Sequence, residues 1–399
     1  MIQTEVATPQ PETNHSTTHN AFDILSRIQV NPRASLKCAL CGETTPLALR
    51  YRCDKCGGVM NVTYDGPQCI KPGSGLHRFE DFLPIQTKAP FLCPETPCVQ
   101  FKNKPYVAHD GIYCKVEGVL ATGNTKYRQS CVAAPGLFWA GVREFVLAST
   151  GNSASSFMYW AGKLEGEIHV HVFVPSTHRY RLRFDNPNVT IHETDVDFVE
   201  TGKLAKAFAR DNRIFVEGGF FNFFRREGLK TGYMEAALQL DFQVDVVFQA
   251  VSSGMGFYGG YIGFKQLLAN GYIKKMPRFV AVQQDTCAPV GSAFHANREE
   301  ITNEDIIRNP TGLGEAILRG NPTATYPYLR HLILETNGTV VAPTQEEIMA
   351  SYEVLARAGI SACHTASVTL AACKRLILDE WIAPEEKCVL ILTGGNYRD

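Results

Sequence analysis

The segment Arg143-Glu144-Phe145-Val146-Leu147-Ala148-Ser149-Thr150-Gly151-Asn152-Ser153-Ala154 changes character halfway along its length. The apolar residues at 145–148 predict a buried β-strand, and the small polar residues at 149–154 predict the tight turn that ends it. An amphipathic helix is expected to follow from Phe157 to Leu164. A strand that runs through a polar turn into a helix is the basic unit of an α/β protein.

The same alternation continues along most of the chain. We predict further strands at 167–175, 188–194, 245–251, 278–283 and 387–395. We predict further helices at 203–211, 263–271 and 345–359. Strands and helices in this order form parallel sheets with helices on both faces, so the expected fold class is α/β.

Three of the predicted strands end in loops rich in glycine, serine and asparagine. These loops cover residues 149–155, 252–260 and 393–396. Ligands of open α/β sheets bind outside the carboxyl ends of the strands, where such loops lie. The loop at 252–260 lacks a G-x-G-x-x-G pattern and comes late in the chain, which argues against a dinucleotide site. We therefore expect a site for a different small molecule where the three loops meet.

Composition and charge exclude several functional classes. The 399 residues carry a formal net charge of −1, so the chain has no electrostatic attraction to nucleic acid or to an anionic membrane. No apolar run is long enough to span a bilayer. The first twenty residues are polar and lack the pattern of a secretory signal. We expect a cytoplasmic protein with a disordered polar tail at residues 1–35.

The cysteines indicate a metal site rather than disulfides. There are 13 of them, an odd number, in a chain without an export signal. Two Cys-x-x-Cys pairs, Cys38 with Cys41 and Cys53 with Cys56, lie eleven residues apart and are followed by two glycines. Four thiolates in this spacing predict a closed, structural zinc site, although four small core residues would give the same count. The other nine cysteines are interpreted as core residues.

Five motifs further along the chain carry the chemistry. They are Ala121-Thr122-Gly123-Asn124-Thr125-Lys126-Tyr127-Arg128, Ser149-Thr150-Gly151-Asn152-Ser153, Asn222-Phe223-Phe224-Arg225-Arg226-Glu227-Gly228-Leu229-Lys230-Thr231, Ser252-Ser253-Gly254-Met255-Gly256 and Thr393-Gly394-Gly395-Asn396. Each motif alone is weak evidence. In this order and spacing, the chain resembles the threonine synthase branch of the fold-type-II pyridoxal-phosphate (PLP) enzymes, which are built like the tryptophan synthase β-subunit. The resemblance covers all but the leading tail.

The resemblance implies a role for most of these motifs. Lys126 is expected to bind PLP as a Schiff base and to carry the Cα proton of the substrate. Asn152 is expected to hydrogen-bond the phenolic oxygen of the cofactor, and Thr393 to face its pyridine nitrogen. The cofactor phosphate is expected at backbone N–H groups that begin a helix. These groups belong to Ser253, Gly254, Met255, Gly256 and Phe257.

The resemblance also implies which residues contact the substrate. The substrate carboxylate is expected at the loop residues Ser149, Thr150, Gly151 and Ser153. A phosphate leaving group and an oxyanionic nucleophile both need fixed positive charge nearby. The candidates for that charge are Arg128, Arg225 and Lys230. For Arg225, a surface salt bridge is an equally good interpretation.

Two features separate the chain from a standard threonine synthase. Tyr127 stands where the family usually has an acid, so we expect different surroundings for the substrate. The stretch from Phe215 through Glu217 and two glycines to Arg225 resembles cysteate synthase, a relative that makes cysteate from O-phosphoserine and sulfite. This second resemblance favours O-phosphoserine as the substrate.

The expected reaction is therefore β-replacement of phosphate on an O-phospho-amino acid, with an aminoacrylate intermediate and sulfite as the nucleophile. The main alternative is threonine synthase chemistry, in which O-phosphohomoserine and water give threonine. A serine/threonine dehydratase-like lyase and a non-catalytic paralogue are two others. The paralogue would purify without the colour of bound PLP.

The resemblance finally implies how the chain divides into domains. A zinc-ribbon-like unit is expected at 36–65, and a large PLP-binding domain at 66–131 and 233–399. A small α/β domain is expected at 132–232, with the cofactor between the two α/β domains. A homodimer is also expected.

Overall fold

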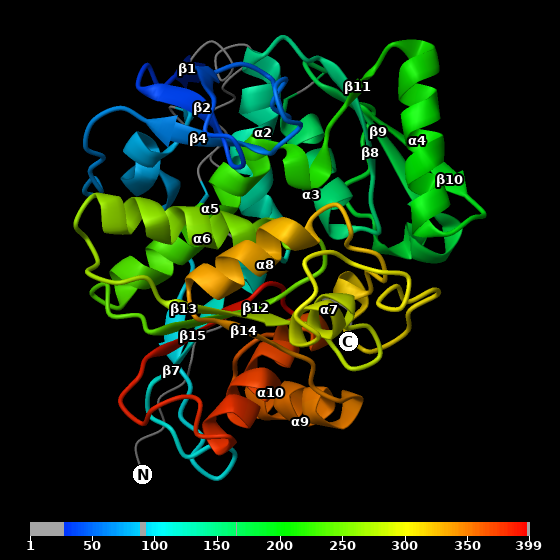
Figure 1. Cartoon of the computed structure of the whole chain (residues 1–399). Coiled ribbons are helices and arrows are strands. Elements are labelled where there is room, and N and C mark those ends of the chain that lie inside the picture. The colour runs from blue at the N-terminus through cyan, green and yellow to red at the C-terminus, as the bar shows by residue number, and fades with distance from the viewer. Residues whose placement is uncertain (1–27, 88–92, 165, 397–399) are drawn as a thin grey trace, which may run out of the picture.

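Two mainly parallel β-sheets form the body of the protein in the computed structural model, which describes residues 28–87, 93–164 and 166–396 (Figure 1). A six-stranded sheet has the order β14-β13-β12-β15-β7-β6, and its neighbours are parallel except for β6 with β7. A four-stranded sheet has the order β10-β9-β8-β11 and is parallel throughout. The predicted α/β class is confirmed.

Helices cover both faces of the six-stranded sheet. The strands are β6 (Cys98–Gln100), β7 (Ile112–Val116), β12 (Val246–Ala250), β13 (Arg278–Val282), β14 (Thr339–Val341) and β15 (Cys388–Leu392). The helices are α5 (Phe223–Gln239), α6 (Met255–Ala269), α7 (Pro289–His295), α8 (Tyr326–Glu335), α9 (Gln345–Arg357) and α10 (His364–Leu378). Figure 1 shows α5, α6 and α8 on one face and α9 and α10 on the other. All residues of β12 and β15 are therefore buried, which explains their apolar sequences.

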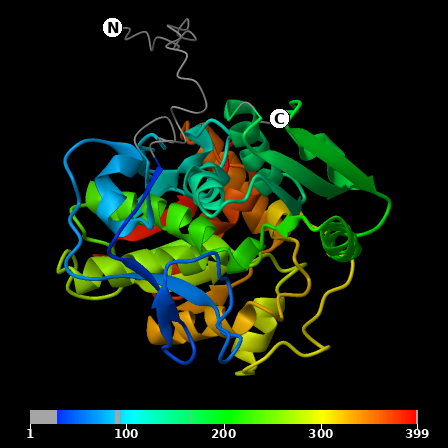
Figure 2. The same cartoon turned by 90° about the horizontal axis from the view of Figure 1, so that it is seen from above.

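The four-stranded sheet forms a smaller unit beside the large sheet. Its strands are β8 (Glu144–Ala148), β9 (His169–Pro175), β10 (Val189–Thr194) and β11 (Phe215–Val216). Its helices are α2 (Lys126–Trp139), α3 (Asn152–Lys163) and α4 (Phe198–Asn212). Figure 2 shows this unit at one side of the molecule, with α4 seen end-on at its outer edge. The sheet lies within the predicted small domain at 132–232, but α5 starts in that range and packs on α6.

Most predicted strands lie where the sequence placed them, but three helices begin earlier than predicted. α4 starts at Phe198 rather than Lys203. α3 starts at Asn152 rather than Phe157, and α6 at Met255 rather than Gly263. The first turns of both helices are rich in glycine or serine, which we interpreted as turns. In α6 these glycines serve packing: a Cβ at Gly260 would lie 2.4 Å from the ring of Tyr233 on α5. Glycine occupies this helical position because α5 and α6 approach each other closely.

The N-terminal part of the described chain is an antiparallel unit. β1 (Ile28–Val30) pairs with β5 (Ile85–Thr87), and a three-stranded sheet has the order β3-β2-β4. Its strands are β2 (Ala34–Cys38), β3 (Thr44–Pro46) and β4 (Met60–Tyr64).

The predicted polar tail at 1–35 is therefore wrong for residues 28–35. Buried Asn31 helps to order this stretch, because its side chain donates to the Leu83 carbonyl at 3.0 Å. Residues 1–27 of the predicted tail lie outside the described residues. Within the described ranges, no helix has the length and apolar character required to cross a bilayer.

Candidate active site

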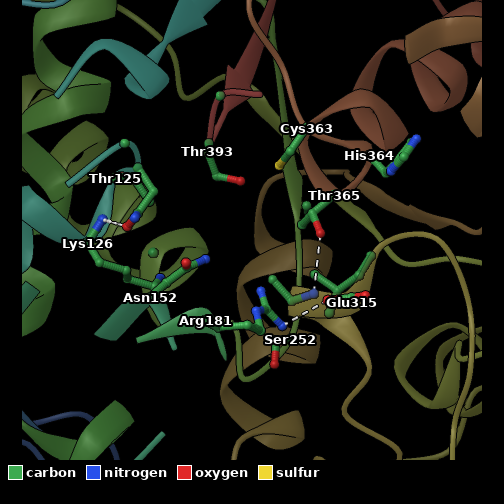
Figure 3. Close-up of a pocket in the computed structure, with 18 of the residues that line it drawn as sticks. Thr125, Lys126, Asn152, Arg181, Ser252, Glu315, Cys363, His364, Thr365 and Thr393 are labelled. Carbon is green, nitrogen blue, oxygen red and sulfur yellow. Dashed lines mark hydrogen bonds and ion pairs between the residues drawn. The ribbon is translucent and has the colours of Figure 1, made fainter. Parts of the chain in front are cut away.

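One cavity of about 440 Å³ lies where the glycine-rich loops meet (Figure 3). The first residues of four helices line it: Lys126 of α2, Asn152 of α3, Met255 of α6 and His364 of α10. Unpaired backbone N–H groups give each helix N-terminus a partial positive charge. The cavity is therefore suited to a ligand with several negative groups, and its place agrees with the site expected where the three loops meet.

Lys126 is the amine on the cavity wall. Its backbone N–H donates to Asn124 Oδ1 at 3.0 Å, and the neighbouring Thr125 N–H donates to the Thr393 carbonyl at 2.9 Å. These bonds fix the start of α2 against the end of β15. Burial, and to a smaller extent the charge of Arg225, lower the pKa of Lys126 to about 8. A sizeable fraction of this amine is neutral and nucleophilic near neutral pH.

This pKa predicts a selective reaction. In protein freed of cofactor, Lys126 is expected to react with an aldehyde reagent along a pH profile with its midpoint near 8, because only the neutral amine attacks. Exposed Lys203, whose pKa is raised by its hydrogen bond to Glu200, serves as the internal control and should react only at higher pH. Borohydride trapping and peptide mapping measure both sites. Equal profiles for the two lysines would contradict the prediction.

The loop before α6 and the N-terminus of this helix are suited to binding an anion. Gly254 precedes the helix with φ +77°, and a Cβ at this position would lie 2.3 Å from Leu329 Cδ2. A Cβ at Gly256 would lie 2.7 Å from the amide nitrogen of Gln249. Ser253, Gly254, Met255 and Gly256 all line the cavity, and only Phe257 of the predicted group does not. These residues fit the phosphate role that the resemblance assigns to them.

The residues that follow β15, 393–396, form another wall of the cavity and are called the C-terminal block here. Thr393 lines the cavity, and the Gly395 N–H donates to the Gly123 carbonyl at 3.1 Å. A Cβ at Gly118 would lie 2.6 Å from the Cα of Gly395, so the two segments are in direct contact. The block therefore connects the lysine segment to the end of β15.

The Ser149–Ala154 turn contributes less to the cavity than expected. Asn152 lines the cavity, but Ser149, Thr150, Gly151 and Ser153 do not. The hydroxyl of buried Ser149 accepts hydrogen bonds from the N–H groups of Gly151 and Ala154, both at 3.2 Å. Ser149 thus stabilises the turn, and the predicted substrate contacts of these four residues are not supported by their positions.

Arg128 does not supply charge to the cavity. Its guanidinium is fully buried between α2 and α5, with Nε 2.6 Å from Glu117 and Nη2 2.7 Å from Glu235. The adjacent Tyr127 packs on Tyr159 and Trp160 rather than facing a substrate. The prediction that Arg128 contacts the substrate is wrong because its side chain points into the core, and the side chain of Tyr127 is buried there as well.

The other two predicted cations are also neutralised. Lys230 is fully buried and pairs with Glu227 one helical turn away, so its prediction as a substrate contact is wrong as well. Arg225 pairs with buried Glu217 and donates to Ser153 Oγ at 3.2 Å. Arg225 does not line the cavity, and its pairing agrees with the salt-bridge interpretation, although the pair is buried.

The sequence interpretation missed several cavity residues. Arg181 is the last residue of the 3-10 helix η3 (Ser176–Arg181), Arg183 lies just after it, and Glu315 begins η5 (Glu315–Ile317). His364 lines the cavity and stacks on Tyr352, with ring centroids 4.3 Å apart. None of these belongs to a recognised motif. The dense charge at 178–183 is the one signal that pointed to this stretch.

The four paired cysteines lie together, as the spacing predicted. Cys38 Sγ is 3.4 Å from Cys56 Sγ, and Cys41 Sγ is 3.7 Å from Cys53 Sγ. A tetrahedral zinc site with Zn–S bonds of about 2.3 Å has sulfur–sulfur edges of about 3.8 Å. A Cβ at Gly58 would lie 2.7 Å from Cys38 Sγ, which explains a glycine after the second pair. The cluster can therefore bind a metal, and we propose zinc.

The remaining nine cysteines do not all belong to the core. Six of them are buried, as predicted: Cys93, Cys114, Cys131, Cys287, Cys373 and Cys388. The interpretation is wrong for Cys69, which is exposed. Cys98 and Cys363 are partly buried against the core, and Cys363 also lines the cavity.

The metal site leads to a second prediction. The purified protein is expected to contain one zinc per chain, and Cys41→Ser is expected to lose most of it, because a closed site needs all four sulfurs. Cys69→Ser is the control, since this exposed thiol lies outside the cluster. Elemental analysis after gel filtration measures the metal content. Full zinc content in Cys41→Ser would count against the site.

Comparison with known proteins agrees with this geometry. Residues 91–394 match the family described as "Pyridoxal-phosphate dependent enzyme". The threonine synthase of Methanocaldococcus jannaschii is 27% identical over 388 residues, which cover 91% of this chain and 92% of that protein. The cysteate synthase of Methanosarcina barkeri is 25% identical over 389 residues, with 91% and 92% covered.

Solved structures are similar at lower identity. Maize serine racemase has a TM-score of 0.64 at 17% identity, with 76% of this chain and 88% of that chain covered. Threonine deaminase isoform 2 from Solanum lycopersicum, in its processed form, has a TM-score of 0.62 at 18% identity, with 76% and 80% covered. Because the family match covers most of the chain, this protein belongs to the pyridoxal-phosphate dependent enzymes, as a synthase or lyase of fold type II.

Proposed function

We propose that the protein replaces the phosphate of O-phosphoserine by a nucleophile, with sulfite giving cysteate. One observation carries the reaction class. The amine of Lys126, the N-terminus of α6, Asn152 and Thr393 all meet in one cavity. The choice of O-phosphoserine is supported by the stretch from Phe215 to Arg225, which resembles cysteate synthase. Glu217 and Arg225 of this stretch form a buried ion pair.

The residues of the cavity fit PLP. Lys126 offers an amine with its pKa lowered to about 8, which favours reaction with an aldehyde. The glycine-bordered start of α6 offers backbone N–H groups to a phosphate. The side-chain amide oxygen of Gln249, Oε1, is buried without a hydrogen-bond partner in the described chain, so this wall still has an unused acceptor. When bound, PLP stabilises negative charge on the substrate Cα.

With PLP bound, each of these side chains would have a separate role. Lys126 takes the Cα proton and later returns one to the product. Asn152 and Thr393 orient the cofactor through neutral polar groups, so neither adds charge to the ring. The C–O bond to phosphate breaks at Cβ, and the sulfite sulfur forms the new bond there. Phosphate leaves with the bonding electron pair. The helix N-termini around the cavity stabilise the anions at both stages.

Threonine synthesis is the second candidate. It is favoured by the match to threonine synthases, one of which is 27% identical along nearly the whole chain. In this reaction, phosphate leaves from Cγ of O-phosphohomoserine and water supplies the new hydroxyl. Both reactions need the same lysine and the same anion-binding elements, so the substrate must separate them. The homodimer implied by the resemblance stays a prediction, which light scattering of the purified enzyme would test.

A phosphate-release assay tests the proposal. Purified enzyme loaded with PLP is given O-phosphoserine or O-phosphohomoserine, each with and without sulfite, and the products are identified by mass spectrometry. Sulfite-dependent release from O-phosphoserine with cysteate as product supports the proposal. Threonine from O-phosphohomoserine supports the second candidate.

Two other outcomes would overturn both candidates. Release with pyruvate as product, independent of sulfite, would indicate a lyase. A colourless protein that binds no PLP would indicate a non-catalytic relative.

A further inference from the structure

We infer that Arg181 is the cation that receives the tetrahedral oxyanion of the substrate, and that it determines specificity for substrates with such a group. The inference rests on the proposed function and deepens it. A guanidinium can bind either the leaving phosphate or the incoming sulfite, because both are small oxyanions. Figure 3 shows Arg181 in the cavity, between Asn152 on one side and Glu315 on the other.

Arg181 is buried but has unused hydrogen-bond donors. Its side chain is 7% exposed and lines the cavity. Nε and Nη1 are buried and have no hydrogen-bond partner in the part of the chain that the structure describes. Buried donors without a hydrogen bond are costly, so we expect a ligand to complete the bonding of this guanidinium. These two donors lie on different edges of the planar guanidinium, and each can donate to an oxygen of a phosphate or sulfite.

The surrounding chain is built to place this side chain. A Cβ at Gly151 would lie 2.8 Å from Arg181 Cβ, so only glycine, here with φ +135°, allows the close contact. Ser155 of α3 then fixes the backbone on both sides: its hydroxyl donates to the Arg181 carbonyl at 3.4 Å and accepts from the Arg183 N–H at 3.1 Å. The turn that carries Asn152 and the segment that carries Arg181 are thus one connected unit.

Glu315 partly balances the charge of Arg181. Its Oε2 lies 3.4 Å from Arg181 Nη1, and the half-exposed carboxylate also accepts a hydrogen bond from Tyr180 Oη at 3.2 Å. The contact to Arg181 has ion-pair distance but is not aligned as a hydrogen bond. Thr365 Oγ1 accepts the Ala316 N–H at 3.3 Å and so orients this segment. An arriving oxyanion would compete with Glu315 for the guanidinium.

The other cations expected to serve this purpose are occupied. Arg128, Arg225 and Lys230 each pair with a buried carboxylate. Lys126 is required for the chemistry itself. Arg183 also lines the cavity, but it is less buried than Arg181. Arg181 therefore combines burial, position on the cavity wall and unused donors.

Binding of inorganic phosphate to the PLP-loaded enzyme tests the inference without turnover. Arg181→Gln is expected to weaken phosphate affinity, measured by calorimetry, about 100-fold, as for loss of one partner of a buried charge pair. Arg181→Lys should restore part of the affinity, because it keeps the charge but loses the fork. Arg179→Gln is the matched control. It lies two residues away, pairs with Asp185 and Glu193, and does not line the cavity.

Glu315→Gln separates a ligand site from a simple contact between two segments. If Arg181 awaits an oxyanion, removing the competing carboxylate should tighten phosphate binding several-fold. If the pair only joins η3 to η5, Glu315→Gln and Arg181→Gln should weaken binding equally, and the inference would be overturned. Unchanged phosphate affinity in Arg181→Gln would overturn it as well. The visible absorbance of bound PLP should be the same in all variants.

Kinetics then identify which oxyanion binds and keep the two proposals apart. A raised KM for O-phosphoserine with kcat little changed in Arg181→Gln assigns the leaving phosphate, and a raised KM for sulfite alone assigns the nucleophile. If wild-type protein binds phosphate through Arg181 but turns over neither phospho-amino acid, the inference stands and the proposed function fails. If Arg181→Gln makes cysteate with unchanged constants, the function stands and the inference fails.

Discussion

Lys126→Ala is expected to lower turnover by about 10³-fold or more, because a positioned acid–base group contributes 10²–10⁴ and the covalent anchor of the cofactor is lost with it. Burial lowers the pKa of this amine to about 8, so that it can accept and donate a proton near neutral pH. The variant should also lose PLP during dialysis, so its visible absorbance should disappear. Phosphate release and the absorbance spectrum of the same preparation measure both effects.

Lys203→Ala is the control for this experiment. Lys203 is an exposed lysine on α4, outside the cavity, and its replacement should leave both readings unchanged. A Lys126→Ala variant that keeps its PLP through dialysis and its full rate would remove Lys126 from the mechanism. Since the same lysine serves β- and γ-replacement, this result does not depend on which substrate is right.

Arg128→Leu is expected to lower the free energy of unfolding by about 3–5 kcal/mol, the usual cost of breaking a buried ion pair by removing one partner. Arg128 is fully buried and contacts both Glu117 and Glu235, and Lys115 contacts Glu235 at 2.5 Å. Leucine fills part of the volume but leaves Glu117 buried without its cation. Urea denaturation followed by circular dichroism measures the change.

Two further variants make this stability experiment specific. Arg50→Leu removes an exposed ion pair with Asp54 and should cost no more than about 1 kcal/mol. Adding Glu117→Gln to Arg128→Leu should recover part of the loss, because the isolated buried carboxylate disappears. An Arg128→Leu protein as stable as wild type would show that the network contributes nothing to the fold.

The same network predicts how acid destabilises the protein. Burial alone would raise the pKa of Glu235, but Arg128 and Lys115 lower it from 4.5 to about 2. A carboxylate with a lowered pKa stabilises the fold above its unfolded value, and this contribution is lost as the pH falls from about 4.5 to 2. In Arg128→Leu one of the two cations is gone. The pKa of Glu235 in the folded protein should then lie closer to 4.5, so its contribution to stability is smaller and its loss is complete at a higher pH. Acid titration of the two proteins would show this difference.

The sequence did not predict β6, β7, β11 and β14, but it predicted the other six strands of the two sheets, most of which are largely buried. Such strands are short apolar runs bounded by turn residues, and this signal survives without knowledge of the fold. α5 was harder to predict, since its residues are buried nearly all round and it lacks a polar face. Arg225 and Lys230 of its motif were predicted to contact the substrate, but the helix packs closely on α2: a Cβ at Gly228 would lie 2.2 Å from the Arg128 carbonyl oxygen.

The cofactor elements could be predicted because they are local in sequence, whereas the substrate contacts are not. Lys126, Asn152 and the loop before α6 each belong to a short motif that lines the cavity. Arg128 failed as a prediction because its partner Glu235 is 107 residues away and becomes visible only in the folded chain. Arg181 was missed because it belongs to no motif. Its place in the cavity depends on a close contact with Gly151 that is also visible only in the folded chain.

The four helices that begin at the cavity have a consequence for how such a protein diverges. Their N–H groups belong to the backbone, so mutation of side chains does not remove them. The capacity to bind anionic ligands is therefore inherited with the fold, while the rim residues of η3 and η5 are free to vary. A change of substrate then requires few substitutions, in η3 and η5 rather than in the segment that carries the lysine. Members of such a lineage are expected to keep one catalytic apparatus while their substrates differ.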